Sequence, residues 1–280
     1  MKKIAITGAS GLVGTRIIEL LSNRFTFIPL SIHDMDITDK HSVHTYLKNL
    51  SYDLLLHLAA YTNVDGAEIE KDKAYLINET GTKNLIEVTK SAHKQFIYIS
   101  TDYVFDGIHP PFVETSVPHP LSIYGASKYA GEKVVGKNGM IVRISNPYRS
   151  FYDIKKDIFR KIKDLLEGGK PLVMVEDSLI VPTLIDDIAE GISYLMNNFS
   201  NETVHLVGKE ALSPFTFAKT IARVFHLDES LVKKTTYENY FEHKAKAPRY
   251  STICSEKNSF YPMHSFEDGL HIIKKQISII

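Results

Sequence analysis

The sequence predicts an α/β fold, a doubly wound parallel sheet with a smaller, interleaved C-terminal lobe. Three observations support this. Short apolar runs alternate with stretches of helical periodicity, a glycine-rich turn follows the first run, and the alternation loosens after about residue 146. Continuous apolar strands separated by helices are typical of a parallel sheet covered on both faces. Right-handed crossovers between such strands then give a Rossmann-type sheet.

The expected elements follow in strand–helix order. Mostly apolar runs are predicted strands, at 3–7, 25–31, 53–60, 95–100 and 139–145. Apolar residues at helical spacing predict helices, at 11–23, 39–50, 74–92 and 122–136. The second half is expected to hold helices 151–167, 184–198 and 214–226, a strand at 202–208 and an irregular tail. The chain therefore divides into residues 1–145 and residues 146–280, with a soft boundary and some later elements returning to the sheet.

Composition and charge exclude several classes of partner. The chain has 280 residues and a formal net charge of +0, so bulk electrostatics suggest neither a nucleic acid nor an anionic membrane. The first apolar run is too short for a signal peptide, and no stretch approaches the roughly 18 apolar residues of a membrane span. The single cysteine, Cys254, rules out an internal disulfide. We expect a cytoplasmic protein.

The turn "ITGASGLVG" suits a dinucleotide. Gly8 permits a tight turn, Gly11 lets a backbone N–H approach a pyrophosphate, and Gly14 permits close packing of helix on sheet. The helix that follows adds its partial positive charge. Because the turn sits between a strand and a helix, we predict a dinucleotide-binding domain at 1–145; the alternative is a glycine-rich turn with no ligand.

The end of the second predicted strand bears on the choice of cofactor. An acidic residue there would hold the adenosine ribose and repel a 2′-phosphate, but counting along the strand places Ser31 at this position. The missing acid removes a bias against NADP without showing a preference for it, so NADP and NAD both stay open. His33 could meet a phosphate. Asp36 and Ile37 could close a loop over the adenine; alternatively Asp36 or Thr38 is the N-cap of the next helix.

Two later strand ends complete a crevice at the carboxyl edge of the sheet. The third ends at Ala59 and Ala60, small residues that would admit ribose and phosphates. The fourth delivers a polar cluster to the same edge: Ser100, Thr101, Asp102 and Tyr103.

Tyr124 and Lys128 lie one turn apart on the helix that follows. An ammonium group and a positive nicotinamide would favour the phenolate, so that Tyr124 could exchange a proton with a substrate while hydride moves. Thr101 could steady the substrate oxygen, and Lys128 could also hold the ribose. We expect the small residues between them to make room for the cofactor. The alternative is an ordinary amphipathic helix.

At these residues the chain resembles the dTDP-4-dehydrorhamnose reductase family of the extended short-chain dehydrogenases/reductases. The matching pieces are "TGASGLVG", "DIT", "AAYTNVDGAE", "STDYVFDG", "PLSIYGASKYAGE" and "VPTLIDDIA". The resemblance implies reduction of a 4-keto-6-deoxy nucleotide sugar, most simply dTDP-4-dehydro-L-rhamnose to dTDP-L-rhamnose, with Thr101, Tyr124 and Lys128 as the catalytic set. With the glycine-rich turn, it implies cofactor contacts from Gly8, Ser10, Gly11, Leu12, Val13, Gly14, Ser31, Asp36, Ile37, Ala59, Ala60, Tyr61, Asn78, Ser100, Tyr124 and Lys128. Substrate contacts would come from Thr101, Asp102, Val104 and Asn146, in a mainly substrate-binding lobe at 146–280.

Three departures from the family pattern stand out: Ser31 for an acid, Asn146 where an aromatic is common, and Ala247-Pro248 with Arg249 in place of an Arg-Pro signature. An arginine there would pair with a substrate pyrophosphate or organise the tail. The resemblance allows a homodimer, and we assign no metal site. Two other functions stay open: a non-catalytic NADP-binding regulatory subunit like that of methionine adenosyltransferase, and a nucleotide-sugar epimerase or dehydratase.

Overall fold

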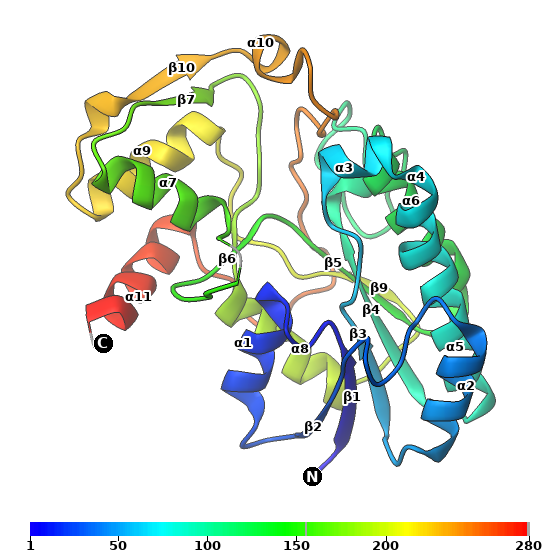
Figure 1. The fold of residues 1–280 in the computed structure, drawn as a ribbon. Helices are drawn as coiled ribbons and strands as arrows, with labels where there is room; N and C mark the ends of the chain where they lie inside the picture. The colour runs from blue at the N-terminus through cyan, green and yellow to red at the C-terminus, as the bar shows by residue number, and fades with distance from the viewer. Residues whose placement is uncertain (155, 279–280) are drawn as a thin grey trace.

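A six-stranded parallel sheet forms the centre of the molecule (Figure 1). This computed structural model describes every residue except 155, 279 and 280. The strand order is β2-β1-β3-β4-β5-β9. Their bounds are β1 Lys3–Thr7, β2 Thr26–Leu30, β3 Leu54–His57, β4 Gln95–Thr101, β5 Met140–Ile144 and β9 Thr203–His205. The order changes direction between β1 and β3, which confirms the predicted doubly wound sheet and puts its switch point beside the glycine-rich turn.

Helices cover both faces of this sheet. One face packs against α1 (Leu12–Leu21) and α8 (Ile185–Asn197), and the other against α2 (Lys40–Asn49), α5 (Thr82–Ser91) and α6 (Ile123–Val135). Within β1, Ile4 and Ile6 face the first pair and Ala5 the other three. Burial on both sides explains why these strands are continuously apolar.

The predicted helix 74–92 is wrong in detail. The chain forms two short helices, α3 (Val64–Ile69) and α4 (Lys71–Tyr75), then a π-helical turn, η1 (Leu76–Gly81), and only then α5. Such π-turns often occur at functional sites, and this one lies against α6.

A second group of elements forms a lobe above the carboxyl edge of the sheet (Figure 1). Its apolar core contains Phe159, Phe217 and Phe266. Its elements are β6 (Pro147–Tyr148), α7 (Ile158–Glu167), β7 (Leu172–Val175), β8 (Thr183–Leu184), α9 (Pro214–Val224), β10 (Val232–Thr235), α10 (Tyr237–Phe241) and α11 (Phe266–Ser278). By contrast, β9 is a strand of the central sheet, and α8 packs on one face of that sheet. The division at residue 145 stays a prediction.

Two expectations for this half are wrong. The helix expected over 151–167 begins only at Ile158, because Asp157 is its N-cap and accepts the main-chain N–H of Arg160 at 2.9 Å. The tail is not irregular, since it contains β10, α10 and α11. In the described part of the chain, no helix has the length and apolar character needed to cross a membrane.

Each outer strand of the central sheet has one position that cannot donate its N–H to a further strand. β2 contains Pro29, which has no N–H to donate. On the other side, the main-chain N–H of His205 in β9 donates to the Glu114 carboxylate at 3.0 Å. That carboxylate also accepts the N–H of Glu256 at 3.0 Å.

Candidate active site

The glycine-rich turn has the geometry of a phosphate cradle. Gly8 has φ +68°, and a side-chain carbon there would lie 2.7 Å from the backbone nitrogen of Ala59. A side-chain carbon on Gly14 would lie 2.3 Å from the Gly8 carbonyl oxygen, so Gly14 lets α1 pack closely against the turn that follows β1. Gly11 is the N-cap of α1 and offers no side chain to its first turn. The first N–H groups of α1 therefore have no side-chain cap and are available to a ligand such as a phosphate.

The neighbouring strand ends carry polar side chains, and most of these form hydrogen bonds within the protein. His57 ends β3, and its ring bonds Thr7 Oγ1 at 2.7 Å and Thr82 Oγ1 at 3.1 Å. Burial lowers its pKa to about 3, so the ring is neutral. By contrast, the buried Ser100 hydroxyl at the end of β4 has no partner among the described residues. An orphaned hydroxyl beside a phosphate cradle fits a dinucleotide cofactor.

Thr101 ends β4 and lies against Tyr124 of α6, whereas Lys128 of the same helix contacts β4 further back; 7%, 9% and 3% of their surfaces are exposed. Burial raises the pKa of Tyr124 to about 12, and a hydrogen bond with Thr101 opposes part of that rise. Lys128 is not among the groups that act on this pKa, so the structure does not bear out the expectation that its ammonium favours the phenolate. A neutral phenol is, however, the form that can donate a proton.

Lys128 is directed toward the sheet. Its Nζ donates to the Ile99 carbonyl at 2.7 Å and lies 4.0 Å from the centre of the Tyr98 ring. Burial lowers the pKa of Lys128 to about 7, and Glu132 acts in the opposite direction.

The small residues of α6 serve protein packing. A side-chain carbon on Gly125 would lie 2.2 Å from the Tyr103 carbonyl oxygen, and one on Gly131 would lie 2.4 Å from the Tyr98 hydroxyl and 2.6 Å from the Asn78 carbonyl oxygen. The expectation that these small residues make room for a cofactor is therefore wrong for both glycines.

Asn78 connects the π-turn to the loop after β3 and to α6. Its Oδ1 accepts the Tyr61 N–H at 2.8 Å. Its Nδ2 donates to the Tyr61 carbonyl at 3.1 Å and to Ser127 Oγ at 2.9 Å. Both amide hydrogens are used, so the side chain holds neighbouring backbone in place.

Asp102 is a buried side chain next to Thr101 that accepts several hydrogen bonds. One oxygen accepts the Thr101 hydroxyl at 3.0 Å, and the other accepts Ser145 at 2.9 Å and Ser251 at 2.5 Å. Burial raises the pKa of Asp102, while the three hydroxyls oppose this. The carboxylate thus connects β4, β5 and a segment of the second lobe.

The other two predicted substrate residues lie nearby. The side chain of Val104 is fully buried in an apolar cluster, so a substrate contact there would come from its main chain. Asn146 has φ +40° and donates to Ser145 Oγ at 3.1 Å.

The end of β2 holds a carboxylate that counting along the strand misses. The N–H and hydroxyl of Ser31 donate to Asp34 Oδ2 at 2.9 and 2.6 Å. Asp36 accepts the N–H and hydroxyl of Thr38, and the N-cap of α2 is Asp39. The two proposed caps, Asp36 and Thr38, are therefore wrong, because an Asx turn at Asp36 precedes the helix. The side chain of Ile37 packs over Gly81.

The second lobe brings to this edge of the sheet two residues that the sequence reasoning missed, Tyr237 and Ala245. Tyr103 packs edge-on against Tyr124, with ring centres 5.5 Å apart, and Tyr237 is close enough to raise the pKa of Tyr103. Across the crevice, the Ala245 N–H donates to Asp65 of α3 at 3.0 Å. Arg249 pairs with Asp177 at 2.5 Å, so in this structure it organises the tail.

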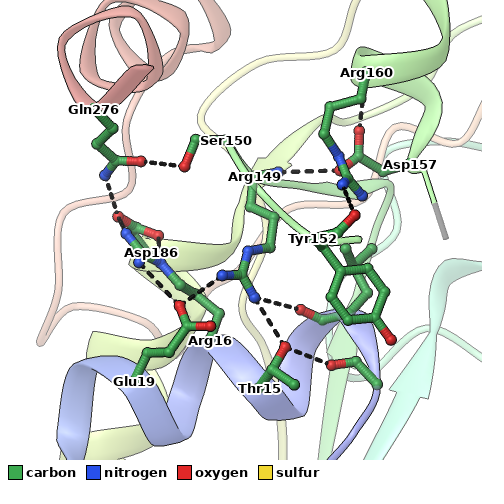
Figure 2. Close-up of polar contacts among 12 residues, drawn as sticks. Thr15, Arg16, Glu19, Arg149, Ser150, Tyr152, Asp157, Arg160, Asp186 and Gln276 are labelled. Atoms are coloured by element: carbon green, nitrogen blue, oxygen red, sulfur yellow. Dashed lines mark hydrogen bonds and ion pairs between the residues drawn. The ribbon is translucent and has the colours of Figure 1, made fainter. Parts of the chain in front are cut away.

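A polar seam fastens this lobe to the glycine-rich turn (Figure 2). Arg149 donates to Thr15 at 2.9 Å and to Glu19 at 2.6 Å, both on α1. The Tyr152 hydroxyl donates to the Ser10 carbonyl at 2.6 Å. Nothing in the local sequence marks either residue, because their partners lie more than a hundred positions earlier.

Comparisons with known proteins agree with this geometry. The RmlD substrate binding domain family matches residues 1–276. A dTDP-4-dehydrorhamnose reductase of Aggregatibacter actinomycetemcomitans is 30% identical over 246 residues, 84% of this chain and 81% of that protein. Methionine adenosyltransferase 2 subunit beta of Rattus norvegicus is 27% identical, over 84% of this chain and 75% of that protein.

A solved structure has the same fold throughout. The dTDP-4-dehydrorhamnose reductase of Bacillus anthracis, solved in complex with NADP, superimposes with a TM-score of 0.91. It is 32% identical, and the match covers 99% of this chain and 100% of that one. The chain therefore belongs to the RmlD substrate binding domain family, among the dTDP-4-dehydrorhamnose reductases.

Proposed function

We propose that this protein is an NAD(P)H-dependent oxidoreductase that reduces the 4-keto group of a 4-keto-6-deoxy nucleotide sugar. The substrate we assign is dTDP-4-dehydro-L-rhamnose, and the product is dTDP-L-rhamnose. The observation that carries the proposal is the buried Thr101–Tyr124 pair at the end of β4, beside the phosphate cradle, in a chain of this family.

The chain's own residues supply the proton and the orientation. The cofactor, when bound, supplies a hydride to the keto carbon. Tyr124 donates its phenolic proton to the keto oxygen, and its raised pKa keeps that proton in place at neutral pH. Thr101 can hydrogen-bond the same oxygen when its hydroxyl turns away from Asp102. To support the tyrosinate left after transfer, Lys128 would have to turn its Nζ away from the Ile99 carbonyl, to which it donates in this structure.

We assign the cofactor to the cradle and the strand ends beside it. The first turn of α1 would hold the diphosphate, with Gly8 and Gly14 allowing close approach. The unpartnered hydroxyl of Ser100 would accept a bond from the cofactor or donate one to it. The segments at 36–37 and 59–61 would enclose the adenosine half.

We infer that residues 146–280 mainly bind the sugar nucleotide and residues 1–145 the cofactor. Asn146 and Tyr237 then face the sugar, and Asp102 aligns Thr101 with them. We place the protein in the cytoplasm, which the single cysteine favours. A homodimer is the assembly we would test first.

A non-catalytic subunit and an epimerase or dehydratase are the competing functions. The similarity to methionine adenosyltransferase 2 subunit beta favours testing the first. The decisive assay follows NADH and NADPH oxidation with a panel of 4-keto nucleotide sugars, using wild type and Tyr124→Phe. Turnover that requires Tyr124 supports the reductase. Cofactor binding without turnover of any sugar would contradict it, and cofactor retained through purification would favour an epimerase or dehydratase.

A further inference from the structure

The turn after β2 brings a carboxylate back to the strand end. The Asp34 N–H donates to the Ser31 carbonyl at 3.1 Å, and the Met35 N–H does so at 3.0 Å. This turn returns the Asp34 side chain to the N–H and hydroxyl of Ser31. Both bonds go to Oδ2, and Asp34 is exposed to solvent, so a ligand can reach its other oxygen.

This carboxylate lies beside the phosphate cradle. Leu30 pairs with Thr7 across β1 and β2, so Ser31 and Gly8, the next residues, occupy neighbouring strand ends. Adjacent strands are about 4.8 Å apart. In a doubly wound sheet, this is where an acidic residue bonds the ribose 2′-hydroxyl of NAD, or an arginine receives the 2′-phosphate of NADP.

The surroundings favour a hydroxyl over a phosphate. Segment 31–42 has no arginine, and its one lysine, Lys40, pairs with Glu87 at 2.9 Å. A surface hollow next to the turn is lined by a second carboxylate, Asp39, as well as by Asp34. Ile32 is 72% exposed on the same turn, an apolar surface suited to a flat base.

We propose that Asp34, held in place by Ser31, is the residue by which this protein discriminates NADH from NADPH. Its free oxygen accepts the ribose 2′-hydroxyl of NADH and repels the 2′-phosphate of NADPH. The inference rests on the proposed function, because it needs a dinucleotide in the cradle. It replaces the expectation that Ser31 leaves the site without an acid.

The test titrates NADH and NADPH separately into wild type, Asp34→Asn and Ser31→Ala, following cofactor fluorescence without any sugar. We expect wild type to bind NADH at least about tenfold more tightly than NADPH, and Asp34→Asn to reduce that ratio by about tenfold or more. Ser31→Ala removes the hydroxyl bond and leaves only the main-chain N–H to hold the carboxylate, so it should give an intermediate ratio. Glu167→Gln, at the far end of α7, removes one negative charge away from the site and should keep the wild-type ratio.

The outcomes separate this inference from the proposed function. If both dinucleotides bind and Asp34→Asn keeps the wild-type ratio, the inference fails while the reductase proposal stands. If His33→Ala changes the ratio and Asp34→Asn does not, the imidazole is the discriminating group and the inference also fails. If folded wild type binds neither dinucleotide, the proposed function itself fails.

Discussion

Tyr124 and Lys128 are both buried, and burial disfavours the charged form of each. Tyr124→Phe removes one hydroxyl and keeps the ring, so we expect folding and cofactor binding to survive. Turnover of a 4-keto nucleotide sugar should fall by about 10²–10⁴, the usual effect of removing a positioned acid. Thr101→Val should lose less, because Thr101 orients the substrate and transfers no proton. Steady-state kinetics checks this ranking, and near-full activity of Tyr124→Phe would contradict the mechanism.

Lys128 also makes stability depend on pH. Its pKa is about 7 in the folded protein and 10.5 as a free side chain. Between these values the unfolded chain binds a proton that the folded chain does not, so the free energy of unfolding should rise with pH above 7, by up to ~1.4 kcal/mol per unit. Lys128→Met should lose this rise. Urea unfolding of both proteins at pH 7, 8 and 9 measures this rise. If the free energy of unfolding changed equally with pH in both proteins, Lys128 would not be the group that titrates in this range.

Helix α6 packs so closely against its neighbours that Gly131 leaves no room for a larger side chain. Alanine is the better helix former by about 1 kcal/mol. Even so, Gly131→Ala should lower the free energy of unfolding by about 1–3 kcal/mol, because its methyl group would meet Tyr98 and Asn78. Gly168→Ala at the end of α7 is a matched control, since its new carbon would have only ordinary contacts. Chemical denaturation of both variants should show the loss in Gly131→Ala alone.

The elements predicted correctly are those whose signal is local. Buried strands such as β1 and β4 are largely continuous apolar runs. The glycines of the cradle predict the tight turn that they permit. The start of α7 was missed because Phe151 and Ile154 are apolar residues that precede the true cap at Asp157. The π-turn at Asn78 has no propensity signature. The carboxylate at the end of β2 depends on a turn that returns Asp34 to Ser31, which counting along an extended strand cannot reveal.

At the scale of the whole molecule, the seam at Arg149 and Tyr152 should couple the second lobe to cofactor binding (Figure 2). Tyr152→Phe removes the bond to Ser10, so we expect a loss of about 0.5–1.5 kcal/mol in unfolding free energy. Cofactor affinity should fall a few-fold, because Ser10 belongs to the cradle. Thermal melting with and without NADH measures both effects, and Tyr240→Phe on α10 is the control. A drop in stability with unchanged affinity would make the seam purely structural.

The outer strands of the sheet also affect how copies of this chain can associate. Along β2, the Thr26 N–H donates inward to Lys2, so alternation directs the nitrogen of Pro29 outward, where it cannot recruit a partner strand. On the opposite side, the Glu114 carboxylate already occupies the His205 N–H. Each outer edge therefore lacks one of the N–H donors that a further strand would need. We therefore expect copies of the folded protein to associate through helices and loops and to resist edge-to-edge aggregation at these two strands.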